Sequence, residues 1–151
     1  MPIIAEKDQA AIRKLFDESL VDPVQLVYFT IPKSLLFLPG RAACETCNDV
    51  QELVEEIGTL SDKISVQVHN LEKEPEVAKS FQVDRVPALI LTKSDTARVR
   101  YFGAPAGYEF STLISDIQQV STGETSLSED TRQVLGAITE PIHIQVFVTP
   151  T

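Results

Sequence analysis

The stretch Cys44-Glu45-Thr46-Cys47 says more about the fold of this chain than any other part of the sequence. It holds both cysteines, three positions apart, and an amphipathic pattern follows it at once. Apolar residues recur there at the spacing of one helix face, at Val50, Leu53, Val54, Ile57 and Leu60. We therefore expect the pair on the first turn of a helix, close enough to form a disulfide. At that place free backbone N–H groups and the helix dipole stabilise a thiolate.

Two thiols at this spacing are the minimum equipment for thiol–disulfide exchange, in which one thiolate attacks and the second thiol releases the product. Cys44, nearer the helix end and solvent, is the expected nucleophile, and Cys47, partly shielded, is the expected resolving thiol. The alternatives are a zinc half-site and a pair of inert buried cysteines. A structural zinc site needs four ligands, and His69 and His143 lie on expected strands at no recognisable ligand spacing. We expect dithiol chemistry without a metal or a bound cofactor.

The two residues between the cysteines, Glu45 and Thr46, are expected to modulate the thiols. A carboxylate beside Cys44 raises the pKa of that thiol against the effect of the helix end, which suits a reductant more than a strong oxidant. The alternative is a solvated glutamate with negligible effect. The first expected strand, Val24–Thr30, contains no acid, so Glu45 or water must carry the proton.

The rest of the chain alternates between helical and strand patterns. Strands are expected over 24–30, 64–69, 86–92 and 98–102, and helices over 12–20, after the cysteines, over 74–81 and over 110–120. This order fits a small mixed sheet with helices on both faces, and hence an α/β fold with an additional N-terminal helix.

Composition limits the classes of partner. A chain of 151 residues with 43% hydrophobic and 23% charged residues can bury one ordinary core. Its formal net charge of −9 argues against nucleic acid and against an anionic membrane surface. Apolar runs such as Pro87–Leu91 are too short to span a bilayer, and the first eight residues show no secretory signal. A tight cysteine pair is typical of a reactive dithiol in a reducing compartment, so we expect a cytoplasmic protein.

A polar, glycine-containing break at Ser121–Ser126 marks an expected domain boundary. Beyond it the start of the chain recurs weakly, because aligning Val27 with Val146 also aligns Tyr28 with Phe147. We therefore expect residues 1–122 to be one unit and residues 123–151 to be a linker followed by the first helix and strand of a second unit.

The strand expected in that second segment is Ile142–Val148. A helix and a strand cannot bury their apolar faces alone, and an exposed strand edge invites pairing. We expect the segment to pack on the first unit or to exchange with a second copy in a homodimer, with Val146 and Val148 buried.

Two further segments, Asp84-Arg85-Val86-Pro87-Ala88 and Arg100-Tyr101-Phe102-Gly103-Ala104-Pro105-Ala106-Gly107-Tyr108-Glu109-Phe110, complete a recognisable pattern. With the two-cysteine motif they resemble the glutaredoxin-like protein disulfide oxidoreductases, which carry two fused thioredoxin folds. The resemblance implies a thioredoxin-like fold and a cis Val86–Pro87 bond packed against the disulfide. It also implies that the Val86 backbone pairs with an extended substrate. The alternative for Pro87 is an ordinary edge-strand proline.

The sequence departs from that family in two places. The family usually continues from the strand before Thr149-Pro150-Thr151 into a second two-cysteine motif, so the chain resembles a truncated form, natural or engineered. Ile31–Arg41 is extra sequence with no family role to assign, and its apolar Leu35–Leu38 could line a substrate groove, lie in the core or meet another copy.

The expected function is dithiol–disulfide oxidoreduction of protein substrates through the Cys44-Glu45-Thr46-Cys47 motif. By analogy with the family, a thioredoxin-reductase-like flavoprotein would restore the reduced pair. One alternative is a dithiol electron-donor domain dedicated to a peroxidase. The other is a redox-inactive interaction module on a thioredoxin scaffold.

Overall fold

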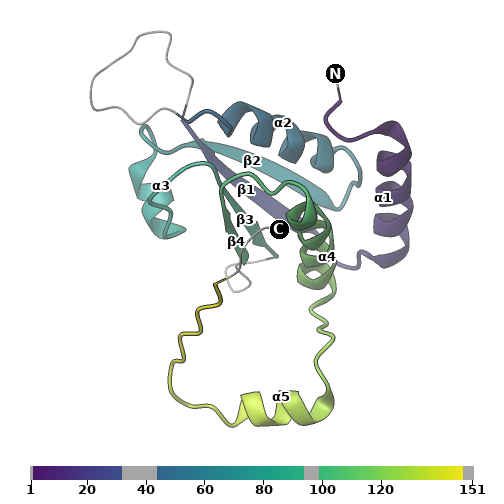
Figure 1. Cartoon of the computed structure of the whole chain (residues 1–151), viewed down its shortest axis with the longest axis vertical. Helices are drawn as coiled ribbons and strands as arrows, with labels where there is room; N and C mark the ends of the chain where they lie inside the picture. Colours follow the sequence, from purple (N-terminus) through teal and green to yellow (C-terminus); the bar gives the residue numbers. More distant parts are fainter. Residues whose placement is uncertain (1, 32–43, 94–98, 148–151) are drawn as a thin grey trace.

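A four-stranded mixed sheet forms the centre of the computed structural model, which describes residues 2–31, 44–93 and 99–147 (Figure 1). The strand order is β2–β1–β3–β4, with β1 at Val24–Thr30, β2 at Ile64–Asn70, β3 at Ala88–Thr92 and β4 at Val99–Phe102. β1 runs parallel to β2, whereas β3 runs antiparallel to both β1 and β4. The mixed sheet expected from the sequence is confirmed.

The two central strands are those with continuous apolar runs. All five residues of β3 are buried, and β1 buries five of its seven. Strands covered on both faces are expected to show such runs. β2 is an edge strand, and Val68, toward its end, is 40% exposed.

Helices cover both faces of the sheet, as expected. On one face lie α1 (Glu6–Ser19), α2 (Cys47–Gly58) and α4 (Tyr108–Thr122), and on the other lies the short α3 (Pro75–Ser80), as Figure 1 shows. Successive residues of β1 point to opposite faces and so feed two cores. The larger core includes Phe16, Leu26, Tyr28, Ile57, Leu89 and Leu113. The smaller one includes Val27, Phe29, Ala78, Val83 and Ile90.

Two close approaches fix how the helices sit on the sheet. A Cβ on Gly58 would lie 2.5 Å from Cγ2 of Val66, so the end of α2 can rest on β2 only with a glycine there. Ser121, near the end of α4, is fully buried. Its hydroxyl accepts hydrogen bonds from the backbone N–H groups of Val21 and Asp22, at 2.9 and 3.1 Å, and donates to the Asp22 carbonyl oxygen at 2.7 Å.

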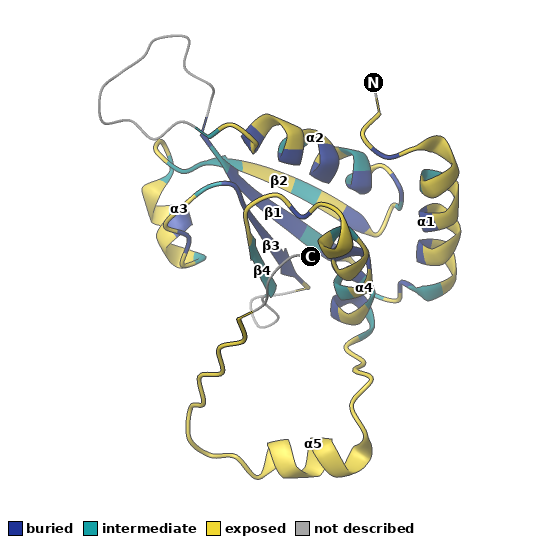
Figure 2. Ribbon diagram, viewed as in Figure 1, coloured by how far each residue is buried: buried dark blue, intermediate teal, exposed yellow. Residues whose placement is uncertain are grey.

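The segment after α4 differs from expectation. Its predicted helix forms as α5 (Glu129–Gly136), with Ser128 accepting a capping hydrogen bond from the Thr131 N–H. Every residue from 123 to 147 is exposed (Figure 2), and residues 142–147 belong to no strand. Val146 is 78% exposed, so the expected packing of this segment on the first unit is wrong for the single chain. A strand needs a partner to satisfy its backbone, and no described strand pairs with residues 142–147. Val148 lies outside the described residues.

Candidate active site

The two cysteines form a disulfide where α2 begins, with their Cα atoms 5.5 Å apart. Only Cys47 belongs to the helix, as its first residue, whereas Cys44 lies in the segment before it. The prediction that both share the first turn is therefore wrong by one turn. Val50 makes the first helical hydrogen bond, to the Thr46 carbonyl oxygen at 3.0 Å. The backbone N–H groups before Val50 have no helical acceptor and point back toward the segment that carries Cys44.

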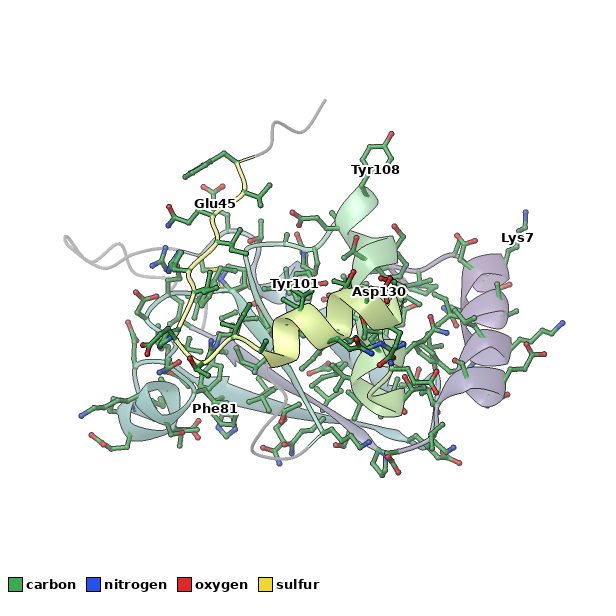
Figure 3. All side chains as sticks on the ribbon, turned by 90° about the horizontal axis from the view of Figure 1, so that it is seen from below. Lys7, Glu45, Phe81, Tyr101, Tyr108 and Asp130 are labelled. Carbon is green, nitrogen blue, oxygen red and sulfur yellow. A yellow bond between two sulfur atoms is a disulfide. The ribbon has the colours of Figure 1, made fainter. Side chains whose placement is uncertain are left out.

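The two sulfur-bearing residues differ in accessibility. Cys47 is 1% exposed, and Cys44 is half-buried. Glu45, labelled in Figure 3, and Thr46 are both exposed. Cys44 is therefore the more accessible of the two cysteines.

A buried tyrosine that the sequence did not point to also contacts the motif. Tyr28, on β1, is fully buried, and its hydroxyl donates a 2.7 Å hydrogen bond to the Cys47 carbonyl oxygen. Burial raises the pKa of Tyr28 to about 12, against a smaller lowering by Thr30, so the hydroxyl stays protonated at neutral pH. One signal was available: Tyr28 is on the same face of β1 as Val24 and Leu26, the face that α2 covers.

The Val86–Pro87 peptide bond is cis, as the resemblance implied. Pro87 is buried and Val86 half-buried, and the Pro87 carbonyl oxygen accepts a 3.0 Å hydrogen bond from the Gly103 N–H. β3 begins just afterwards, at Ala88, because proline has no N–H for a ladder. Ala88 pairs with Phe29 near the end of β1, so Val86–Pro87 lies at the sheet end where β1 runs toward the cysteines. The predicted contact between Pro87 and the sulfur atoms stays a prediction.

Arg85, the residue before Val86, contacts one charged and one aromatic side chain. The Arg85 guanidinium pairs with Asp84 at 2.8 Å and holds the pKa of that carboxyl below its usual range. The guanidinium carbon lies 5.4 Å from the ring centroid of Phe102, which is 46% exposed. Tyr101 lies away from this edge, because it packs against the larger core while Val86 packs against the smaller one, and its hydroxyl donates to the Asp116 carboxylate. Arg85 and Phe102 therefore border the candidate substrate edge.

The remaining candidates fall outside this site. Within residues 2–31, 44–93 and 99–147, no three His, Cys, Asp or Glu side chains lie together in a way that could hold a metal ion. His69 is engaged in packing: its Nδ1 lies 2.7 Å from Oε2 of Glu74, and its ring stacks on Phe29. Leu35–Leu38, like most of the Ile31–Arg41 insertion, lies outside the described residues. In the described part of the chain no helix has both the length and the apolar character to cross a membrane.

No protein-family model matches the chain, but individual proteins do. It is 28% identical over 107 residues to NADH dehydrogenase of Bacillus subtilis, which covers 71% of this chain and 19% of that protein. It is 25% identical over 115 residues to the F component of alkyl hydroperoxide reductase in Staphylococcus epidermidis, covering 76% of this chain and 20% of that protein. The chain thus spans about a fifth of the length of these curated relatives.

A solved structure gives a longer match. The protein disulfide oxidoreductase from Aeropyrum pernix K1 superposes with a TM-score of 0.71 at 27% identity, covering 88% of this chain and 54% of that one. The fold is therefore a thioredoxin-like α/β fold, as expected. The resemblance to protein disulfide oxidoreductases is confirmed by this neighbour.

Proposed function

We propose that this chain is a dithiol–disulfide oxidoreductase that exchanges with the disulfides of protein substrates. The observation that carries the proposal is the Cys44–Cys47 disulfide at the start of α2, with one accessible and one buried cysteine. The start of a helix favours a thiolate at the accessible position. The likeness to a protein disulfide oxidoreductase across most of the chain supports the same activity.

The reaction uses the two cysteines in turn. The Cys44 thiolate attacks one sulfur of the substrate disulfide, so that a Cys44–substrate disulfide forms while the other substrate sulfur leaves and takes up a proton. Cys47 loses its proton and attacks the Cys44 sulfur, which closes the intramolecular disulfide and releases the second substrate thiol. Two electrons pass to the substrate. A thioredoxin-reductase-like flavoprotein is the proposed source of the electrons that reopen the Cys44–Cys47 disulfide.

The proposed docking edge for the substrate is the backbone of Val86. An extended peptide can add to this edge by main-chain hydrogen bonds, as in other cases of strand addition. The half-burial of Val86 and its place at the cysteine end of the sheet support this assignment. Glu45 and Thr46 are exposed beside Cys44, where they would meet the bound substrate and modulate the thiol.

Trapping the intermediate tests the assigned roles. Cys47→Ser should accumulate mixed disulfides with protein substrates, because no second thiol releases them. Cys44→Ser should form none and should lose disulfide reductase activity. Non-reducing gels and mass mapping read both outcomes. Full activity in both variants would falsify the roles, and unreactive thiols at neutral pH would favour the redox-inactive interaction module.

A second candidate is an electron-donor domain dedicated to one peroxidase. The sequence likeness to the F component of alkyl hydroperoxide reductase favours it. The two candidates differ in breadth of substrate. A general reductase should act on several unrelated protein disulfides at comparable rates, whereas a dedicated donor should reduce a peroxidase disulfide far faster than any other.

The segment after the first unit is proposed to be a linker and the opening of a second thioredoxin-like unit. The superposed 88% of 151 residues is about 133 residues, more than the 122 of the first unit, which supports this division. We propose that its exposed apolar side chains are covered by exchange with a second copy. Sedimentation across a range of protein concentrations tests this, since a monomer at every concentration would rule the exchange out.

The reducing chemistry and the net charge of −9 support a cytoplasmic protein that binds neither nucleic acid nor membranes.

A further inference from the structure

Tyr28 joins the centre of the sheet to the first residue of α2. Its backbone lies in β1, with Val68 of β2 opposite on one side and Leu89 of β3 on the other. Its hydroxyl reaches across the larger core to the Cys47 carbonyl oxygen, at 2.7 Å. Because the ring is fully buried and its backbone is held on both sides, the sheet fixes where this hydroxyl lies.

The contact restrains the sulfur of Cys47 through a short covalent path. The carbonyl oxygen and Sγ of one cysteine are four bonds apart, so a fixed carbonyl leaves Sγ only its few side-chain rotamers. The other end of the disulfide, Cys44, lies outside the helix and is not held by α2. The resolving thiol is therefore the one that the core holds in place.

We propose that Tyr28 is a positioning residue for thiol–disulfide exchange, holding the start of α2 so that Cys47 presents its sulfur to Cys44. This rests on the function proposed above. Holding two reacting groups in place raises the effective concentration of one at the other. The Tyr28 hydrogen bond should therefore increase two quantities. One is the rate at which Cys47 displaces a substrate from Cys44, and the other is the stability of the Cys44–Cys47 disulfide relative to the dithiol.

Tyr28 acts by position and moves no proton. In the resolving step the Cys47 sulfur bonds to the Cys44 sulfur, the Cys44–substrate bond breaks, and the substrate thiolate takes up a proton. With its pKa raised to about 12 by burial, the Tyr28 hydroxyl remains a donor throughout this step.

The variant Tyr28→Phe tests the inference, because it keeps the ring and removes only the hydroxyl. The Cys47 carbonyl retains the N–H partner that α2 supplies, so no buried group is left unpaired and the variant should fold. We expect the release of a substrate bound to Cys44 to slow about fivefold, the size expected for one neutral hydrogen bond. The equilibrium constant for oxidation by glutathione should fall by the same factor. That change makes the reduction potential about 20 mV less negative, at 29.6 mV per tenfold.

A matched control separates positioning from stability. Tyr101→Phe also removes one hydroxyl, which donates to the Asp116 carboxylate instead of to the motif. It should lower the melting temperature but leave the release rate and the glutathione equilibrium constant within twofold of the parental values. Alkylation of Cys44 should proceed at the parental rate in both variants.

The outcomes are distinct. If Tyr28→Phe lowers the melting temperature and leaves release rate and potential unchanged, Tyr28 is only a structural residue and the inference is overturned. The glutathione equilibrium needs no protein substrate. A parent chain that reduces no protein disulfide therefore defeats the proposed function, while a shifted potential in Tyr28→Phe still supports the positioning role.

Discussion

Two parts of this chain have related sequences and opposite surroundings. Val27 and Tyr28 lie on the central strand and are 0% exposed. The residues aligned with them in the weak repeat, Val146 and Phe147, are 78% and 89% exposed. The first pair belongs to β1, while the second lies in an extended segment after α5, outside any strand.

The difference shows that a β-forming pattern indicates which residues could be buried in a strand. It does not determine whether those residues are buried. β1 has a hydrogen-bonded neighbour on each side and helices over both faces. Residues 142–147 have no such neighbour within the described chain. Strand propensity largely measures fit to neighbouring strands, so the same kind of sequence takes its structure from its context.

The largest expected effect separates the two regions by chemistry. Cys44→Ser in the packed unit should reduce disulfide reductase activity to that of buffer, because the nucleophilic thiolate is lost. Val146→Ser, a serine substitution in the exposed segment, should keep activity within about twofold, since surface changes away from a site are usually mild. Turnover of a protein disulfide by the two variants measures both. A large loss in Val146→Ser would break the comparison by showing that the exposed segment contributes to the site.

Hydrogen exchange should show the next largest difference. Amides in the middle of β1, such as that of Val27, should exchange at least about 10³-fold more slowly than unprotected amides, since they open only with the whole fold. Amides of residues 142–147 should exchange at nearly unprotected rates in dilute protein. If exchange with a second copy covers these residues, their protection should rise with protein concentration. Strong protection at every concentration would contradict the exposed segment seen here.

Truncating one valine in each region compares their contributions to the free energy of unfolding. Val27→Ala should lower the free energy of unfolding by about 2 kcal/mol, from lost burial and the cavity left behind. Val146→Ala, at the aligned position, should change it by less than about 0.5 kcal/mol. Denaturant midpoints with unchanged slopes give both values. Equal losses in the two variants would mean that Val146 is buried in solution.

The smallest expected effect concerns the Glu74 carboxylate, which accepts hydrogen bonds in the first unit. Hydrogen bonds from the Asn70 N–H, at 2.9 Å, and from His69 hold the pKa of Glu74 below its usual 4.5. A carboxyl whose pKa is lowered by folding contributes stability above its unfolded pKa and loses it as pH falls through the folded pKa. Glu74→Gln should therefore lose less stability than the parent between about pH 5 and about pH 3.

The matched control for that test is Glu76→Gln, in the first turn of α3, the helix that Glu74 caps. It should follow the parent's dependence on pH. Denaturant midpoints at several pH values measure all three proteins. If Glu74→Gln and the parent lose stability equally on acidification, the hydrogen bonds from Asn70 and His69 do not act as described.

Periodicity predicted the elements whose burial depends on their own residues. The expected strand Val24–Thr30 matches β1 residue for residue, and the pattern after the cysteines matches α2. The cis Val86–Pro87 bond followed from the family resemblance, because no residue pattern alone distinguishes it from an ordinary edge proline.

Features that depend on distant contacts were not predictable in the same way. Tyr28 and Cys47 are 19 positions apart, and nothing local indicates that a hydroxyl on one reaches the carbonyl oxygen of the other. The start of α2 at Cys47 depends on where the first helical hydrogen bond forms, which the apolar spacing does not fix to one residue. Phe102, an apolar residue within an expected strand, is 46% exposed because it lies at the end of an edge strand.

The buried hydroxyl of Ser121 has a mechanical consequence. It binds the backbone of Val21 and Asp22, about 100 positions earlier in the chain, just before the central strand begins. A force that pulls on residues 123–147 acts first on the last turn of α4. The Ser121 hydrogen bonds transmit this force to Val21 and Asp22, just before β1 begins. The helix end cannot peel away by itself without breaking three hydrogen bonds at once. Tension applied to the exposed segment is therefore carried by β1, a strand with a hydrogen-bonded neighbour on each side.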